Sequence, residues 1–424
     1  MQHLTDYLST LALINMRIGF FTDSYLPRLD GIAVSVESFR SALEREGHEV
    51  YVFCPTRPEP FKEPTKRIYR FKSVSMGMYE GYRQTLPYLP RHMKYIKNLD
   101  LDIIHVHTPT QIGSLGIYAA KKFNIPLATT CHSDFSLAED YKWLKIVFGL
   151  TTVLTSLATK NNMSVKQIAK MLQPKLSLKK WDKKVVSQMI KHYYSLFDLI
   201  ITPSQKIQND LKRYKIKTEV LPTGIPGVIK RTSTQKAARA QFGIDTKVFV
   251  YVSTSRPVKE KRIDFIIKAF GQIKNTPNAM LAIAGDGPEI PKLKELCDEL
   301  NLYDQVRFFG QLPHADIFKL LQACDVLVHS SIRETQGLVL NEAAVIGLPV
   351  LLIDEDINPI FIDDKSCLRA KNSVPDFAKK MQILAHSPDL RKKLASSARQ
   401  NSRKYTEPIQ AKKLLDFYAE LLSS

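Results

Sequence analysis

Residues 17–53 read RIGFFTDSYLPRLDGIAVSVESFRSALEREGHEVYVF. The apolar run 17–21 ends in a loop, the pattern over 31–47 predicts an amphipathic helix, and 50–53 is a second apolar run. Short apolar runs that bracket a helix are typical of parallel strands that helices cover on both faces. This stretch therefore predicts the first strand–helix–strand unit of a parallel α/β sheet.

The same alternation continues along the chain in two series separated by a linker at 225–234. The first series has further strands at 102–106, 126–130 and 199–201, with helices at 112–122 and 204–214, the latter capped by Ser204. The second series has strands at 248–252, 280–284, 306–309, 326–329 and 349–353, with helices at 262–273, 289–300, 314–323 and 336–346. We predict an α/β chain with two doubly wound, Rossmann-like parallel-sheet domains. Such sheets bind a ligand at the carboxyl ends of their strands, here in a cleft between the domains.

Composition excludes several classes of protein. A hydrophobic share of 44% with 24% charged residues excludes a mainly disordered chain. The five cysteines are scattered and form no C-x-x-C pair, which argues against a disulfide framework or a zinc knuckle. No G-x-x-x-x-G-K-[ST] or G-x-G-x-x-G occurs, so neither a P-loop ATPase nor an ordinary dinucleotide-binding protein is supported. No segment is long enough to cross a bilayer, and residues 1–15 form an extension without the basic start of a signal peptide.

The net charge of +19 suggests an anionic partner. Residues 142–191 hold 11 lysines, no arginine and one acid, a balance that favours a diffuse anionic surface over the reading of nucleic-acid bases. Apolar residues at helical spacing accompany these lysines in two stripes, 165–172 and 186–197. We predict that this insert binds an anionic membrane surface through Lys166, Lys170, Lys179, Lys180, Trp181, Lys183 and Lys184. The alternative is an ordinary amphipathic helix that packs on the domain core with a solvated lysine face.

The second series carries the candidate chemistry. Glu334 and Glu342 flank the start of a helix, where the backbone N–H groups of Gln336, Gly337 and Leu338 could face a diphosphate. Taken alone, two glutamates of this kind are more often solvated surface residues.

Two cations follow the first strand of that series. Arg256 and Lys261 could neutralise a diphosphate leaving group, although an isolated basic loop is usually solvated surface. Gly285 and Asp286 lie in a tight turn after the next strand, which by itself is weak evidence for a ligand loop.

In the first series, Gly31 lies where the first strand leads into its helix, and His132 lies at the end of the strand 126–130. His105 and His107 are expected on one face of the neighbouring strand because side chains alternate. A zinc site formed by the three histidines is conceivable but disfavoured, since no acidic or cysteine motif completes it.

Together these motifs resemble the retaining glycosyltransferases of family four, which have the GT-B fold. The resemblance covers nearly the whole chain from Met16. It is carried by residues 21–31, 130–135, 203–204, 221–225 and 285–288, by Arg256 with Lys261, and most specifically by Glu334 and Glu342 within S-x-x-E-T-Q-G. One departure is Ser253-Thr254-Ser255 before Arg256, where many members carry glycine.

The resemblance implies a role for each residue. Glu334 is expected to hold sugar hydroxyls and Glu342 the ribose, while Arg256 and Lys261 hold the diphosphate. Gly31 is expected to approach the phosphate and sugar, and His132 to contact the sugar near the reacting carbon. The family retains the anomeric configuration and needs no divalent metal, so we expect no cofactor beyond a sugar nucleotide.

The E-T-Q-G-L sequence is also found in the branch that glucosylates diacylglycerol. It implies transfer of glucose from UDP-glucose to diacylglycerol or a related lipid, by a cytoplasmic enzyme bound peripherally to the inner face of the cell membrane. The expected domains are an extension at 1–15, an acceptor-binding and membrane-facing domain at 16–225, a nucleotide-sugar-binding domain at 226–407, and a helix at 408–424 that packs back on the first domain.

Two other functions stay open. One is a glycosyltransferase that acts on a soluble or polysaccharide acceptor. The other is a non-catalytic protein that binds nucleic acid through its basic face, which the four site residues and the arginine-free insert disfavour; we expect no nucleic-acid partner.

Overall fold

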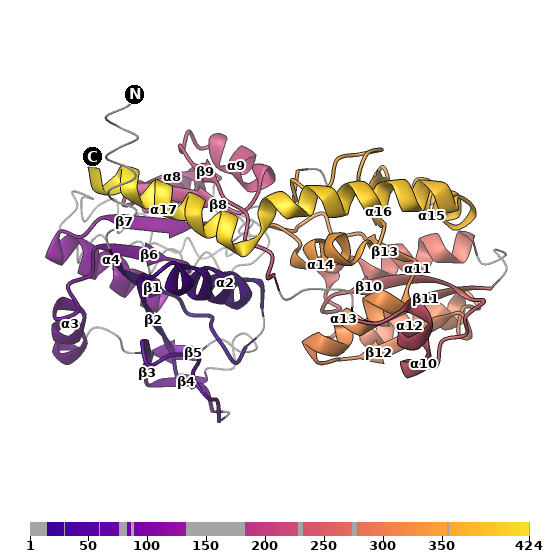
Figure 1. Cartoon of the computed structure of the whole chain (residues 1–424), viewed down its shortest axis with the longest axis horizontal. Helices are drawn as coiled ribbons and strands as arrows, with labels where there is room; N and C mark the ends of the chain where they lie inside the picture. The colour runs from indigo at the N-terminus through magenta and orange to yellow at the C-terminus, as the bar shows by residue number, and fades with distance from the viewer. Residues whose placement is uncertain are drawn as a thin grey trace. The chain divides into compact units, whose positions relative to one another are not determined.

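The computed structural model describes residues 15–28, 30–58, 60–75, 83–85, 89–132, 183–227, 232–273, 278–353 and 356–423. The chain divides into two compact units. Unit 1 comprises Met1–Gly224 with Glu407–Ser424, and unit 2 comprises Ile225–Thr406. Each unit contains a parallel sheet with helices packed on it (Figure 1).

The sheet of unit 1 has seven strands in the order β3-β2-β1-β6-β7-β8-β9, and every neighbouring pair is parallel. Its strands are β1 (Arg17–Phe21), β2 (Glu49–Pro55), β3 (Ile68–Phe71), β6 (Ile103–Val106), β7 (Leu127–Thr130), β8 (Leu199–Thr202) and β9 (Glu219–Val220). A separate antiparallel pair joins β4 (Ser73–Ser75) to β5 (Arg83–Thr85). The central strands are apolar on both sides, as burial by helices on both faces requires.

The helices of unit 1 are α2 (Gly31–Arg45), α3 (Pro90–Lys97), α4 (Gln111–Phe123), α8 (Lys183–Tyr194), α9 (Gln205–Lys212) and α17 (Glu407–Ser423). The C-terminal helix α17 packs with α2 on one face of this sheet (Figure 1). Its Ala411, Leu414 and Tyr418 are buried in a core that also contains Phe20 and Val52. The last helix of the sequence therefore completes the first unit.

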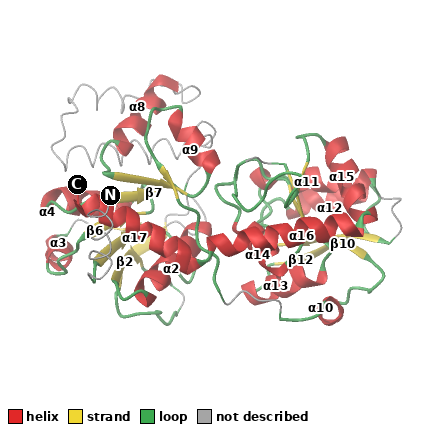
Figure 2. Ribbon diagram, turned by 45° about the horizontal axis from the view of Figure 1, so that its top comes forward, coloured by secondary structure: helices red, strands yellow, loops and turns green. Residues whose placement is uncertain are grey.

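The sheet of unit 2 has six parallel strands in the order β12-β11-β10-β13-β14-β15. They are β10 (Phe249–Thr254), β11 (Ala279–Ala284), β12 (Val306–Gly310), β13 (Val326–His329), β14 (Val350–Leu352) and β15 (Leu368–Arg369). The helices are α10 (Gln235–Gln241), α11 (Ile263–Gln272), α12 (Ile290–Glu299), α13 (His314–Ala323), α14 (Leu338–Ile346), α15 (Val374–His386) and α16 (Pro388–Ser402), with short turns η1 (Lys259–Lys261) and η2 (Arg403–Tyr405). Figure 2 shows α14 lying beside α16 in this unit.

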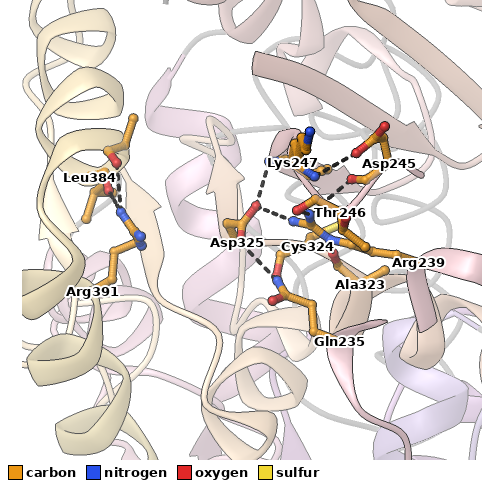
Figure 3. Close-up of polar contacts among 12 residues, drawn as sticks. Gln235, Arg239, Asp245, Thr246, Lys247, Ala323, Cys324, Asp325, Leu384 and Arg391 are labelled. Atoms are coloured by element: carbon orange, nitrogen blue, oxygen red, sulfur yellow. Dashed lines mark hydrogen bonds and ion pairs between the residues drawn. The ribbon is translucent and has the colours of Figure 1, made fainter. Parts of the chain in front are cut away.

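A buried polar network closes the amino-terminal edge of this sheet (Figure 3). Arg239 donates to Asp325 Oδ2 at 2.7 Å and to the carbonyl oxygens of Ala323 and Thr246 at 2.9 and 2.8 Å. Asp325 also accepts from the Val250 backbone N–H at 2.7 Å, so its charge is both paired and hydrogen-bonded. A buried ion pair of this kind is tolerated because its polar atoms are satisfied within the protein.

The predicted α/β fold class with two Rossmann-like parallel sheets is confirmed, and Ser204 caps α9 by accepting from the Ile207 N–H. Sequence analysis did not predict β3, β4, β5, β9, β15, α3, α10, α15 or α16. The strands among these are short, and a run of two to four residues gives too little periodicity for a prediction.

For the apolar stripe 186–197 the structure shows the alternative, a helix that packs on the domain core. Met189, Ile190, Tyr193 and Phe197, in α8 and the turn after it, are buried in the core of unit 1. Of the predicted membrane residues, Lys166, Lys170, Lys179, Lys180 and Trp181 lie outside the described residues. Lys183 and Lys184 begin α8, and their side chains are also outside the description.

Candidate active site

The predicted residues of unit 2 lie where the order of its strands reverses. The chain runs from β10 outward to β11 and β12, then returns to the other side of β10 with β13. In open parallel sheets, ligands bind at such a switch point, beside the carboxyl ends of the strands. The loops that follow β10 and β13 carry Arg256, Lys261 and Glu334.

The structure brings Lys261 and Glu334 together. Lys261 Nζ donates to Glu334 Oε2 at 2.5 Å, and the two side chains are 25% and 17% exposed. His329 Nε2 lies 3.7 Å from the same carboxylate oxygen. Ser330 Oγ donates to the carbonyl oxygens of Lys261 and Arg262, both at 2.8 Å, so the two loops are tied together. The result is a partly exposed ion pair held on fixed backbone.

Close backbone packing explains why the 285–288 turn contains glycines. A Cβ on Gly285 would lie 2.1 Å from the Ser255 carbonyl oxygen, and one on Gly287 would lie 2.5 Å from that of Pro257. Gly285 also has a φ of +135°, which side chains rarely allow. These glycines therefore let the turn pack against the loop that presents Arg256, whose side chain is exposed. Asp286 is exposed, and its Oδ1 accepts from the Gly287 N–H at 2.8 Å.

The helix α14 begins at Leu338, and no side chain caps its N-terminus. Gly337 at the cap has a φ of +67°, and a Cβ there would lie 2.8 Å from Leu340 Cδ1. Gln336 is buried, and its carbonyl oxygen accepts from Asn358 Nδ2 at 3.3 Å. The first N–H groups of α14 therefore have no side-chain cap among the described residues.

Glu342 pairs with a residue that sequence analysis missed. His314 Nε2 and Glu342 Oε1 are 2.7 Å apart, and the carboxylate raises the pKa of His314. His314 begins α13 after β12, so it belongs to the same carboxyl edge of the sheet. Its position at the start of the helix that follows a predicted strand was the signal that could have found it.

In unit 1 the strand order reverses between β1 and β6. Gly31 begins α2 after β1, and Asp30 caps the helix by accepting from the Ala33 N–H at 2.9 Å. A Cβ on Gly31 would meet nothing within 4 Å, and its φ is not positive. The fold itself therefore does not require glycine at this position.

His132 follows β7, and its ring stacks on that of His107, the residue directly after β6. The rings of His105 and His107 are 4.3 Å apart, which confirms that they share a face, and those of His107 and His132 are 5.4 Å apart. Burial lowers the pKa of His132 to about 4 and that of His105 to about 3, and it holds the pKa of His107 well below 6.5. The negative charge of Asp30 raises the pKa of His132 and so opposes the effect of burial, which places His132 near the start of α2. Within the described ranges, no three His, Cys, Asp or Glu side chains are grouped as a metal site requires.

A hollow of about 740 Å³ on unit 1 lies elsewhere. Its lining includes Asp198 and Glu219, which lie at the amino-terminal ends of β8 and β9. It contains none of the predicted catalytic or donor-binding residues and lies at the opposite edge of the sheet from His132.

Comparison with protein families gives two matches that together span most of the chain. Residues 29–226 match the model of Glycosyltransferase Family 4, and 234–401 match Glycosyl transferases group 1. The alpha-monoglucosyldiacylglycerol synthase of Streptococcus pneumoniae is 30% identical over 79% of this chain and 70% of its own length. The synthase of the same name from Acholeplasma laidlawii is 28% identical over 96% of this chain and 98% of its own length.

Solved structures share the fold. The sucrose-phosphate synthase of Thermosynechococcus elongatus matches with a TM-score of 0.71 and 19% identity, over 96% of this chain and 100% of that one. The Anabaena protein Alr3699/HepE, solved with UDP-glucose, matches with a TM-score of 0.69 and 18% identity over the same shares. Among the helices that the structure describes, none has the length and apolar character needed to cross a membrane. The chain belongs to the family four glycosyltransferases of the GT-B fold, near the diacylglycerol glucosyltransferase branch.

Proposed function

We propose that this glycosyltransferase moves glucose from UDP-glucose to the hydroxyl group of 1,2-diacylglycerol or a related membrane lipid, with retention of the anomeric configuration. The observation that carries the proposal is the Lys261–Glu334 pair at the carboxyl edge of unit 2, in a chain that matches a glucosyldiacylglycerol synthase over 96% of its length.

The charges of unit 2 suit a sugar nucleotide. A carboxylate such as Glu334 accepts hydrogen bonds from sugar hydroxyls, while Lys261 and Arg256 offer positive charge to a diphosphate. Gly337 and Leu338 add the N-terminus of α14, whose dipole also favours an anion. Glu342 would accept hydrogen bonds from the ribose hydroxyls. To do so, it must either keep its contact with His314 on one oxygen and bind the ribose with the other, or break that contact.

The same cations support a reaction without a divalent metal. As the bond from the anomeric carbon to the diphosphate oxygen breaks, negative charge grows on that oxygen, and preorganised cations stabilise it. We propose front-face attack, in which the lipid hydroxyl oxygen bonds to the anomeric carbon and its proton passes to the departing phosphate oxygen. This route needs neither an enzymatic nucleophile nor a separate base.

Unit 1 is proposed to bind the acceptor and to supply Gly31 and His132. The open space beside Gly31 supports approach of a ligand there. His132 is proposed to contact the sugar near the reacting carbon.

Helix α3 of unit 1 supports peripheral binding to an anionic membrane. Arg91, Lys94 and Lys97 are exposed on it, Tyr95 is 38% exposed beside them, and its sequence holds no acid. Each basic side chain near an anionic leaflet contributes about 1 kcal/mol, and an exposed aromatic ring suits the headgroup region. We propose a cytoplasmic enzyme held in this way at the inner face of the cell membrane.

The test uses vesicles that contain diacylglycerol and an anionic phospholipid, with UDP-glucose as donor and release of UDP as the measured signal. We expect UDP release above a control without diacylglycerol, an α-linked product by NMR, and the same rate in EDTA. UDP release that does not depend on lipid would contradict the lipid acceptor, and release abolished by EDTA would contradict the metal-free reaction.

Membrane binding is tested separately by sedimentation with the same vesicles. The variant Arg91→Glu/Lys94→Glu should shift protein to the supernatant. The matched control Lys392→Glu/Lys393→Glu changes charge equally on the exposed face of α16 and should not. Equal sedimentation of both variants would remove α3 from the proposal, and an enzyme that never sediments would favour a soluble acceptor.

A further inference from the structure

Three histidine rings form a continuous stack at the carboxyl edge of the sheet in unit 1. His105 lies in β6, His107 directly after β6, and His132 after the neighbouring strand β7. The planes of His105 and His107 differ by 8° and those of His107 and His132 by 25°. The edge of the Phe20 ring packs against both His105 and His107, at centroid distances of 5.6 and 4.7 Å.

The inner ring of the stack is held at both nitrogens. His105 Nδ1 lies 2.5 Å from Tyr418 Oη, and His105 Nε2 lies 2.8 Å from Thr130 Oγ1. Tyr418 is buried and belongs to α17, so the C-terminal helix anchors the base of the stack. His107, which is only 2% exposed, rests on this fixed ring.

The hydrogen bond between the outer two rings has a direction that burial decides. His107 Nδ1 and His132 Nε2 are 3.2 Å apart, so one nitrogen donates and the other accepts. The other nitrogen of His107, Nε2, is buried and has no hydrogen-bond partner among the residues that the structure describes. A buried N–H without an acceptor is rarer than a buried acceptor without a donor, so the proton of His107 belongs on Nδ1.

We propose that His107 is a positioning residue that donates from Nδ1 to His132 Nε2 and thereby leaves the proton of His132 on its Nδ1. His132 then offers the reacting sugar a hydrogen-bond donor and not a base, an assignment that rests on the proposed contact of His132 with the sugar. Histidine tautomers are generally set in this way, by the bond that the second ring nitrogen makes.

The consequence for the reaction is specific. A neutral His132 with its proton on Nδ1 has its one lone pair committed to His107, so it cannot accept the proton of the acceptor hydroxyl. That proton must go elsewhere, which agrees with its transfer to the departing phosphate oxygen. Burial supports the neutral state, because it lowers the pKa of all three rings.

The direct test is the tautomer of His132 in the unmodified protein. The full chain, labelled with ¹⁵N only at histidine, is examined by long-range ¹H–¹⁵N correlation at neutral pH, and His132 is assigned from its loss in His132→Gln. We expect a protonated Nδ1 and an unprotonated Nε2 on His132, with a protonated Nδ1 on His107. A protonated Nε2 on His132 would overturn the proposal, whatever the activity.

Kinetics provide a second test. The change His107→Leu should lower kcat by about 10- to 100-fold with KM for UDP-glucose changed less than about twofold, because positioning partners typically contribute that much. His107→Asn keeps an N–H donor near the position of Nδ1 and should recover most of the rate, provided the tautomer of His132 is kept.

His48→Asn is the matched control. His48 is also buried in unit 1, where its Nδ1 accepts from the Met16 N–H at 3.2 Å, just before β2 at the amino-terminal edge of the sheet. Its replacement should leave kcat unchanged. If His132→Gln were inactive while His107→Leu kept full activity and an unaltered His132 tautomer, the positioning role would be wrong and the proposed function would stand. If His132→Gln were fully active, the proposed sugar contact would be wrong, and the NMR result would still decide the direction of the hydrogen bond.

Discussion

An acidic residue precedes the strand β13 and another follows it; their side chains are similarly exposed, at 18% and 17%, but their basic partners are not. Asp325, just before the strand, pairs with Arg239, whose side chain is 6% exposed, and also accepts a backbone hydrogen bond. Glu334, five residues after the strand, pairs with Lys261 in a site where both side chains are partly exposed. The Arg239–Asp325 pair lies at the amino-terminal edge of the sheet. The Lys261–Glu334 pair lies at the carboxyl-terminal edge, where parallel sheets bind their ligands.

The difference shows how position along a strand separates stability from function. At the amino-terminal edge, the described hydrogen bonds of Arg239 and Asp325 are made to other groups of the protein. At the carboxyl-terminal edge, the loops that follow β10 and β13 hold charged side chains that are partly exposed and can bind a substrate.

The largest expected effect is on stability at the inner pair. Asp325→Ala leaves the Arg239 guanidinium buried without its counter-charge, so we expect the free energy of unfolding to fall by about 3–5 kcal/mol. Urea unfolding measures the change. The control Asp316→Ala breaks the exposed pair with Lys319 and should cost under about 1 kcal/mol. Equal losses of unfolding free energy in the two variants would show that the Arg239–Asp325 pair stabilises the fold no more than an exposed pair does.

The outer pair should show the opposite pattern. Lys261→Met and Glu334→Gln should each lower kcat/KM by about 10²- to 10³-fold, because they remove charge that we propose faces the leaving group or the sugar. The midpoint of thermal unfolding should change by less than about 3 °C, since the pair is partly exposed. If a variant lost stability as well as activity, the Lys261–Glu334 pair would have a structural role like that of Arg239–Asp325.

The carboxyl edge of unit 1 extends the comparison, because its histidines are uncharged. The pKa of His132 is about 4 and that of His105 about 3 in the folded chain, both below the unfolded value near 6.5. Above pH 6.5 the rings are neutral in both states. As the pH falls below 6.5 the unfolded chain binds protons that the folded chain does not, so stability is lost, by about 1.4 kcal/mol per histidine at pH 5.5.

Thermal unfolding from pH 7.5 to 5.5 measures how steeply stability falls with pH, and His132→Gln should make this fall less steep. His314 works in the opposite direction, because Glu342 raises its pKa and the pair gains from protonation. A slope that stays the same in His132→Gln would show that this ring is not held neutral by burial.

The smallest stability effect is expected at Gly31. Because a Cβ there meets nothing and φ is not positive, Gly31→Ala should leave stability unchanged or raise it by up to about 1 kcal/mol. Activity should nevertheless fall if a ligand occupies the open space. Full activity in Gly31→Ala would remove this residue from the donor site.

Much of the architecture could be predicted because local patterns carry it. Buried strands such as β1 and β10 are continuous apolar runs, and the helices between them have a clear apolar period, so the parallel α/β class follows. Pairings between distant residues could not be predicted in the same way. His314 with Glu342, and Tyr418 with His105, join elements whose meeting depends on strand order and helix packing.

The basic insert illustrates the limit. A stripe of apolar residues beside lysines fits both a membrane helix and a helix on a protein core, and only the packing of Met189 and Tyr193 against the sheet of unit 1 distinguishes them for α8.

The sequence by itself determined the two series of strands and helices, the chemical character of the residues after each strand, and the membership of a glycosyltransferase family. Only the tertiary structure decided which of those residues meet. Lys261 reaches Glu334, and His107 reaches His132, because parallel pairing brings the ends of separate strands to one edge, and no local pattern in the chain records that register.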